Sequence, residues 1–138
     1  MPNSVLVFPD DATALEPRHH PPCDKSVISA PLISVQASAS QGAGAAGVRH
    51  VATGATFSWG SALTLAAATI GMAIIDGASG GATKLWQAVV AVGSIGMYDT
   101  GPLNLPGTAA TALTAEFSGL VTNATQCVTL RFHDIGNV

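Results

Sequence analysis

Histidines come first among residues that could do chemistry, because imidazole is the commonest protein ligand for transition metals. The chain has four of them. His19 and His20 are adjacent, so their side chains point apart on an extended chain. His50 and His133 stand alone in sequence, and no HxH, HExxH or Cys/His cluster accompanies them. We therefore expect no metal site and no cofactor.

Carboxylates could supply a general acid or base, but they are few and far apart. Asp76 precedes a glycine in a turn sequence, and Asp99 lies in the turn-like run Tyr98-Asp99-Thr100-Gly101. Asp134 follows His133, and such a pair could orient an imidazole for nucleophilic catalysis. No GxSxG motif supplies the nucleophile. We therefore predict that the chain is not an enzyme and has no catalytic residues.

Two further groups allow both a structural and a functional interpretation. Glu116 is expected on the outward face of its strand, where solvent or a cross-strand pair with Arg131 would satisfy it. Trp59, Trp86 and Tyr98 could line a platform for a sugar ring. Aromatic residues in a β-sandwich belong more often to the core or to an interface, so both interpretations stay open.

The elements that would position these residues are strands. Apolar and polar residues alternate in short runs separated by turn signals. The runs predict strands over 27–35, 48–59, 63–75, 84–92, 97–105, 111–118 and 127–133. The last run is the clearest, with Val128, Leu130 and Phe132 on the face opposite Arg131 and His133. This pattern predicts an all-β fold, an antiparallel β-sandwich or jelly roll of about eight strands.

Prolines, glycines and alanines modify this pattern. Pro31 predicts an edge or bulged strand, and Gly71 predicts a bulge. Residues 37–47, which are all small or polar, are expected to form a loop, and Gly93–Gly96 a turn. Ala62–Ile75 is rich in alanine, the best helix former, so a helix there stays open beside the strand.

The N-terminal part has a different composition. Residues 1–26 hold five of the eight prolines, which predicts an extended arm before a sandwich domain over 27–138. The arm contains a compact apolar run, Val5, Leu6, Val7 and Phe8. We expect this run either to bind a neighbouring subunit or to fold back as an edge strand on its own domain, and it is the candidate partner-binding site.

The net charge and the lengths of the apolar runs limit which partners and which compartment we expect. The net charge is −3, which argues against a nucleic-acid binder. The N-terminus does not resemble a secretion signal, and no apolar run is long enough for a bilayer, so we expect no membrane and synthesis in a cytoplasm. Whether Cys23 and Cys127 pair stays open. Only 9% of residues are charged, against about 25% in typical domains, which favours a surface in contact with protein.

Several segments resemble small virion proteins of tailed bacteriophages, including capsid cement (decoration) proteins with a jelly-roll fold. These segments are Gly47-Val48-Arg49-His50-Val51-Ala52, Ala73-Ile74-Ile75-Asp76-Gly77-Ala78 with Leu85-Trp86 after a glycine-rich turn, Leu103-Asn104-Leu105 and Leu113-Thr114-Ala115-Glu116-Phe117. The resemblance covers about residues 47–134, and its most specific piece is the run DGA…G…LW.

The resemblance implies a non-enzymatic structural protein on the capsid surface of a virion. Such a protein would be a homo-oligomer, with a dimer favoured over a trimer, and would bridge subunits of the major capsid protein. One alternative is a phage tail or fibre-base sandwich that contacts a host glycan. Another is a carbohydrate-binding or adhesin-like sandwich outside any virus.

Overall fold

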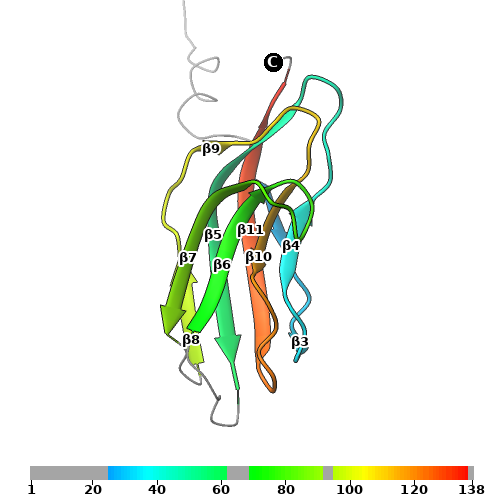
Figure 1. Cartoon of the computed structure of the whole chain (residues 1–138). Coiled ribbons are helices and arrows are strands. Elements are labelled where there is room, and N and C mark those ends of the chain that lie inside the picture. Colours follow the sequence, from blue (N-terminus) through cyan, green and yellow to red (C-terminus); the bar gives the residue numbers. More distant parts are fainter. Residues whose placement is uncertain (1–24, 62–68, 92–94, 137–138) are drawn as a thin grey trace, which may run out of the picture.

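A computed structural model describes residues 25–61, 69–91 and 95–136. The described chain contains no helix and folds into ten strands in two antiparallel sheets, as predicted for a β-sandwich (Figure 1). The strands are β2 (Lys25–Ile28), β3 (Leu32–Ile33), β4 (Ser38–Gln41), β5 (Arg49–Gly60), β6 (Thr69–Asp76), β7 (Lys84–Ala91), β8 (Ile95–Asp99), β9 (Leu105–Pro106), β10 (Leu113–Phe117) and β11 (Thr125–Ile135).

At most connections the chain passes from one sheet to the other. The four-stranded sheet has the order β4-β10-β6-β7, and the six-stranded sheet has the order β2-β11-β5-β8, with β3 on β11 and β9 on β5. β6 and β7 form a hairpin within one sheet, whereas β4 and β5, β5 and β6, β7 and β8, and β10 and β11 lie in opposite sheets. The sheets are therefore joined by many crossing connections.

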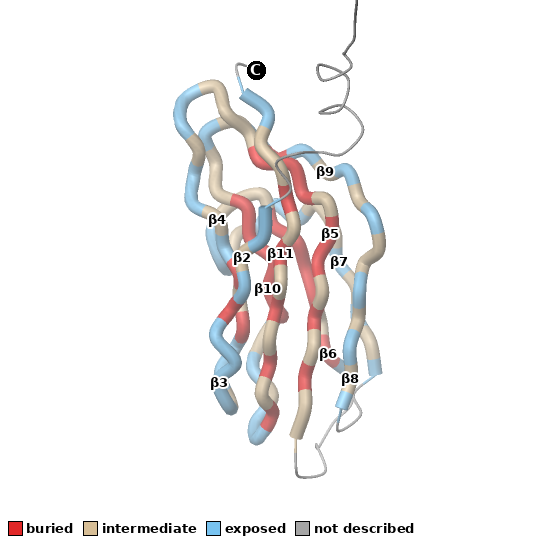
Figure 2. The backbone as a smooth tube through the Cα atoms, turned by 180° about the vertical axis from the view of Figure 1, so that it is seen from behind, coloured by how far each residue is buried: buried red, intermediate tan, exposed pale blue. Residues whose placement is uncertain are grey.

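The long strands β5 and β11 run side by side through the middle of the six-stranded sheet. They pair from Thr125 with Gly60 to Ile135 with Arg49, and the register shifts once, between Arg131 and Phe132. The predicted alternation on β11 is confirmed, because Val128, Leu130 and Phe132 are buried while their neighbours are partly exposed. Figure 2 shows the buried stretches as red bands along the strands.

The core lies between the sheets and is organised by aromatic rings. Phe57 of β5 meets Phe117 of β10 edge to face, with ring centroids 5.5 Å apart. Phe57 also stacks on Trp86 of β7 at 5.9 Å, and Trp59 meets Phe117 at 6.2 Å. Aromatic pairs at such distances contribute about 0.5–1.5 kcal/mol beyond the area they bury. Contacts of this kind hold the two sheets face to face.

Several of the predicted elements differ from the structure. The predicted strand over 97–105 is interrupted, because β8 ends at Asp99 and Leu105 belongs to β9. Ser38–Gln41 lies in the segment predicted to be a loop but forms β4, because its backbone pairs with β10. Gly71 pairs regularly with Val89, and the irregularity of β6 falls between Ile74 and Ile75 instead. Ile95 and Gly96 belong to β8 rather than to a turn.

Two other predictions of the elements are confirmed, and the predicted end of the arm is corrected. Pro31 lies between β2 and β3, so the predicted edge strand is interrupted there. Thr69–Asp76, the second half of the segment with a helical alternative, is a strand. Residues 62–68 lie outside the described part. Lys25 and Ser26, which were assigned to the arm, belong to β2. The remainder of the arm, with Val5–Phe8 and Cys23, also lies outside the described residues.

Candidate functional site

Exposed apolar side chains gather at the edges of the six-stranded sheet. On β8, the side chains of Ile95 and Met97 are 81% and 72% exposed. On the opposite edge, Ile28, Leu32 and Ile33 are also exposed. Scattered exposed apolar residues are ordinary, but a group of them on one face marks a contact surface.

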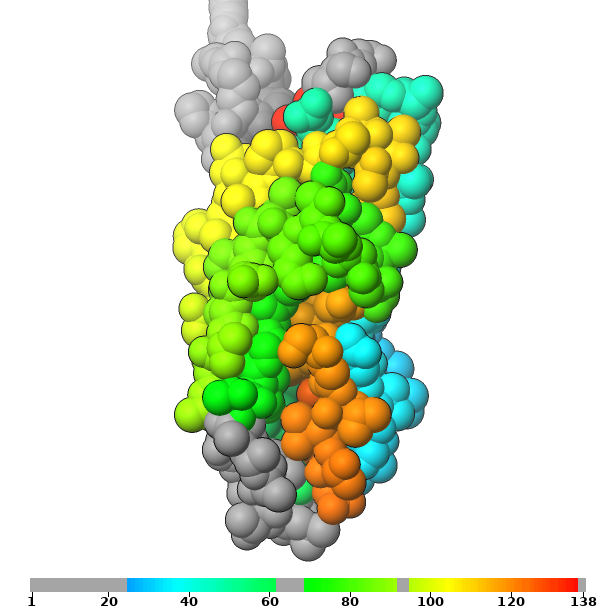
Figure 3. All heavy atoms as spheres, in the orientation of Figure 1, coloured from blue at the N-terminus to red at the C-terminus, as the bar shows by residue number. Residues whose placement is uncertain are grey.

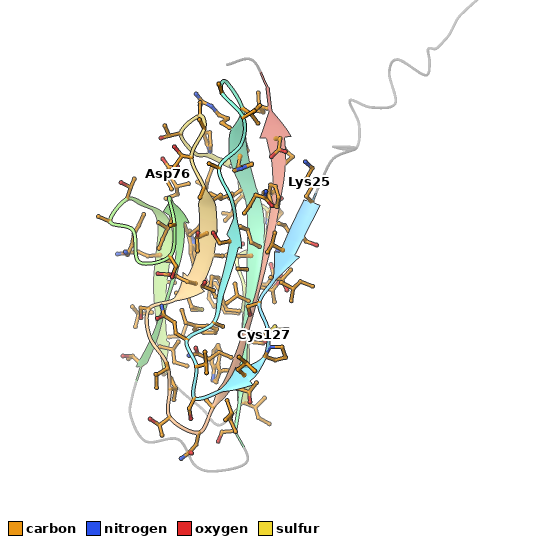
Figure 4. All side chains as sticks on the ribbon, turned by 90° about the vertical axis from the view of Figure 1, so that its right-hand side faces the viewer. Lys25, Asp76 and Cys127 are labelled. Carbon is orange, nitrogen blue, oxygen red and sulfur yellow. The ribbon has the colours of Figure 1, made fainter. Side chains whose placement is uncertain are left out.

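A shallow groove crosses the outer face of this sheet. It has a volume of about 570 Å³ and is lined by Pro31, Ser58, Trp59, Gly60, Ile95, Gly96, Met97, Thr125 and Cys127; we call it the outer groove. Met97 pairs with Ser58, and Ser58 pairs with Cys127, so the three residues form a row across β8, β5 and β11. Figure 4 shows Cys127 near the end of the sandwich opposite to Lys25. None of the described residues that line the outer groove is charged.

β8 forms one edge of the six-stranded sheet in the described part of the chain. Among the described strands β8 pairs only with β5, so its other side presents backbone N–H and C=O groups. Proteins usually protect such edges with charges, prolines or bulges. Asp99 is the one charged residue on this strand, at its end. The combination of an open backbone edge and exposed Ile95 and Met97 can receive an added strand or an apolar protein surface.

A polar cluster occupies the other half of the same face. The Arg131 guanidinium donates to Thr56 Oγ1 at 2.8 Å and to Asp99 Oδ2 at 3.2 Å. Hydrogen bonds from Thr56 and from the Gly101 backbone, together with the Arg131 charge, hold the pKa of Asp99 below its usual range. Gly54 has no side chain where the Arg131 guanidinium lies, since a Cβ there would be 2.7 Å from Nη2. This cluster therefore braces β11, β5 and the end of β8.

A pocket of about 760 Å³ opens beside this brace. Its lining includes Arg131, Asp99, His133, Asn104 and Thr53. Arg131 and Asp99 are already engaged with each other and with Thr56, so the charged groups of this pocket serve the fold.

Glu116 lies on the outer face of β10, as predicted, but it is buried there, and the predicted pair with Arg131 does not form. Its side chain is 5% exposed, and its carboxylate accepts hydrogen bonds from Ser79 Oγ and from the Gly80 backbone N–H at 3.1 Å. The loop between β6 and β7 folds over β10 and covers it, which sequence alternation could not reveal. Figure 3 shows the green atoms of this hairpin across the middle of the four-stranded sheet.

Asp134 does not act on His133, its neighbour in sequence, as a catalytic pair would require. Its Oδ1 lies 2.6 Å from Nδ1 of His50, and its Oδ2 accepts a hydrogen bond from Lys25 Nζ at 2.6 Å. Burial raises the pKa of Asp134, but hydrogen bonds and positive charge from Lys25 and His50 outweigh it, so the pKa lies below its ordinary value. This cluster could not be predicted from the sequence, because Asp134 is 84 positions from His50 and 109 positions from Lys25.

The remaining candidates have structural positions. Asp76 ends β6 and accepts hydrogen bonds from the backbone N–H and the hydroxyl of Thr108, at 2.9 and 2.6 Å. Trp59 is only 7% exposed, and Trp86 lies between Phe57 and Tyr98, with ring centroids 5.9 and 5.8 Å away. Trp59 therefore belongs to the core, whereas Trp86 and Tyr98 are partly buried against it.

In residues 25–61, 69–91 and 95–136, no three His, Cys, Asp or Glu side chains come together in a way that could hold a metal ion. No helix within these ranges could span a membrane. Neither the protein-family models nor the curated proteins that were compared with the sequence match it.

Proposed function

We propose that this chain is a non-enzymatic structural protein that binds the outside of an assembled phage capsid and bridges subunits of the major capsid protein. It would be made in the host cytoplasm and would act on the capsid surface, as a homo-oligomer. The observation that carries the proposal is the outer groove beside the edge strand β8. The side chains of Ile95 and Met97 are exposed to solvent there, and the described residues that line the groove are uncharged.

The physical basis of the proposal is linkage. A protein that binds the assembled shell and not the free subunits stabilises the shell by the free energy of that binding. Many copies that each contact two subunits also gain from a high effective concentration. Such binding requires apolar, shape-matched surface and a free strand edge, and it requires no catalytic group.

The strand order supports a jelly roll as the finer description of the sandwich. Without the two-residue strands β3 and β9, eight strands remain, ordered β2-β11-β5-β8 and β4-β10-β6-β7. A jelly roll also consists of eight strands in two sheets, joined by crossing connections of Greek-key type. The resemblance of residues 47–134 to phage cement proteins also implies a jelly roll, so the strand order agrees with it. We adopt this resemblance as part of the proposal.

The carboxylates are consistent with a structural role. Asp76, Asp99, Glu116 and Asp134 each accept hydrogen bonds from this chain's own residues. Each therefore stabilises the fold, and the surface that remains is poor in charge.

The number of copies in a purified particle tests the proposal. A cement protein should be present in numbers comparable with the major capsid protein, and the purified chain should bind capsids that lack it but not free capsid subunits. A few copies per particle, together with binding of a host glycan by the wild-type chain, would instead establish the tail or fibre-base alternative. A Trp59→Ala variant is unsuitable for that comparison because Trp59 lies in the core.

Substitution in the outer groove tests the surface itself. Met97→Asp should weaken binding to capsids at least tenfold, since a charge would have to be buried in an apolar contact. Val89→Asp on β7 is the matched control, because Val89 is similarly exposed, at 68%, but lies in the other sheet. Equal binding by the two variants would refute the role of the groove.

Deletion of the N-terminal segment tests the predicted partner-binding residues Val5, Leu6, Val7 and Phe8. The deletion should end at residue 24, because β2 begins at Lys25. We expect the shortened chain to fold and to leave capsids more readily than the full chain. Full occupancy of the capsid by the shortened chain would refute the arm as a binding element.

A further inference from the structure

Two loops at one end of the sandwich expose apolar side chains and turn polar side chains inward. Leu32 and Ile33 form β3, Val35 follows it, and Leu120 lies between β10 and β11. These four residues, which we call the end patch, are between 43% and 65% exposed. Figure 3 shows the orange atoms of the loop before β11 beside the cyan atoms around β3 and β4. A group of exposed apolar side chains of this kind marks a contact surface.

Hydrogen bonds hold the two loops to each other. The backbone N–H of Ser34 donates to the carbonyl oxygen of Ala124, and Ser34 Oγ accepts from the backbone N–H of Asn123, both at 2.8 Å. The amide of Gln126, which is fully buried, bonds backbone groups of both loops. Ser34 and Asn123 adopt left-handed backbone conformations, with φ of 55° and 68°, which persist only where the surroundings fix them. A partner that binds the end patch therefore has little backbone to order.

The surroundings of the end patch are uncharged. Residues 29–37 and 117–128 contain no charged residue. Among the described residues, the charged ones that come closest along the strands are Glu116, which is buried, and Asp99. Asp99 pairs with Thr56, four residues before the end of β5, which is about 13 Å at 3.3 Å per residue. A partner of the end patch should therefore be apolar and uncharged, because an unpaired charge is costly to bury.

The distribution of charge along the chain favours a second copy as this partner. Residues 25–138 hold as many basic as acidic residues, so the net charge of −3 belongs to residues 1–24. That acidic segment joins the sandwich at Lys25, which pairs with Phe132, seven residues along β11 from Thr125. Figure 4 shows Lys25 and Cys127 toward opposite ends. Seven residues span about 23 Å. Two copies that meet through their end patches therefore keep these attachment points about 45 Å apart, far beyond the screening length of about 8 Å.

We propose that the end patch is the surface through which two copies of this chain associate end to end. The contact is isologous, with Leu32, Ile33, Val35 and Leu120 of each copy facing the same patch of the other. This inference rests on the homo-oligomer of the proposed function and names its surface. The outer groove lies on the side of the six-stranded sheet, so each chain offers one surface to its copy and another to the capsid.

The size of this end sets the strength of the contact. A sandwich end is about 20 Å wide across four strands and about 20 Å deep through two sheets with their side chains. Two copies therefore bury roughly 800–1,000 Å² in total, below the range of about 1,200–2,000 Å² of stable complexes. We expect a weak dimer in solution, with a Kd on the order of 10–100 µM. The dimer fills where many copies are held close together.

Sedimentation velocity of the full chain, from about 10 µM to about 1 mM, tests the proposal. We expect a monomer–dimer equilibrium that is the same at low and high salt, since no charged residue takes part. Leu120→Asp should weaken the dimer at least tenfold, because two carboxylates would meet in an apolar contact. Ile135→Asp is the matched control, because Ile135 is 40% exposed but lies at the other end of β11, and it should dimerise like the wild type. Val35→Asp, in the other loop, should behave like Leu120→Asp and replaces it if that variant fails to fold.

The possible results separate the end patch from other surfaces and other partners. The proposal is overturned if the wild-type chain stays monomeric at about 1 mM, if Leu120→Asp and Ile135→Asp dimerise equally, or if Met97→Asp abolishes the dimer. Binding of the monomer to vesicles of neutral phosphatidylcholine, lost in Leu120→Asp, would overturn it in favour of a lipid surface. A monomeric wild-type chain that still binds capsids would refute the end-to-end dimer and leave the capsid role standing.

Discussion

Replacement of Gly96 by alanine probes the packing that joins β8 to the core. Gly96 pairs with Trp59 across β8 and β5, and the indole lies where a side chain at position 96 would project. A Cβ there would lie 2.1 Å from Cζ2 of Trp59, far inside van der Waals contact. The ring is rigid, 7% exposed and packed against Phe117, so it cannot move without loss of other contacts.

The expected cost follows from this overlap. Insertion of a methyl group into a well-packed core destabilises a protein by about 1–3 kcal/mol. We expect Gly96→Ala to lower the free energy of unfolding by about 2 kcal/mol. At roughly 4 °C per kcal/mol for a domain of this size, the midpoint of thermal unfolding should fall by about 8 °C.

Gly60→Ala provides the matched control. Gly60 lies on β5 beside Ile95, and a Cβ there would meet no atom within 4 Å. The same substitution should therefore be neutral or stabilise the chain by up to about 1 kcal/mol, through reduced freedom of the unfolded chain. Urea denaturation followed by tryptophan fluorescence measures both variants. If Gly96→Ala is as stable as Gly60→Ala, the placement of Trp59 over β8 is wrong.

Three further substitutions test buried and charged groups. Glu116→Ala should cost about 1–3 kcal/mol in urea denaturation, because the Ser79 hydroxyl and the Gly80 N–H lose their acceptor; a loss below about 0.5 kcal/mol would contradict its burial. Gln126→Leu should cost a similar amount, since the fully buried amide bonds backbone groups at two loops. The pKa of Asp99 is lowered in the fold, so its contribution is present above the unfolded value near 3.9 and is lost as the pH falls through the folded value. Asp99→Asn should therefore flatten the loss of stability below about pH 4, as measured by urea denaturation at each pH, and an unchanged acid limb would refute this assignment.

Strands with large alternating side chains could be predicted from sequence, and strands without them could not. β11 has Val128, Leu130 and Phe132 at every second position, so its period and its buried face were predictable. β4 consists of small and polar residues, and its backbone becomes a strand because β10 lies beside it. The preference of such a segment depends on its neighbours more than on its own residues.

The sequence could predict what kind of surface the candidate site is, but it could not predict where on the fold it lies. Low charge indicated a surface that contacts protein, but the position of Ile95 and Met97 at an open edge depends on which strand ends the sheet. Alternation placed Glu116 on the correct face of β10, but it could not show that the loop between β6 and β7 covers that face. The pairing of Asp134 with His50 rather than His133 likewise depends on the register of β5 against β11.

The pairing of β2 with β11 has a consequence for synthesis. Lys25 and Asp134, which form an ion pair at one end of this pairing, are 109 positions apart in the chain. Because translation proceeds from the N-terminus, β2 leaves the ribosome long before its neighbour exists, and the six-stranded sheet cannot be completed until the last strand has emerged. Distant pairing slows folding and leaves strand edges open to aggregation in the meantime. Slower expression at low temperature, or chaperone coexpression, should therefore raise the yield of folded protein.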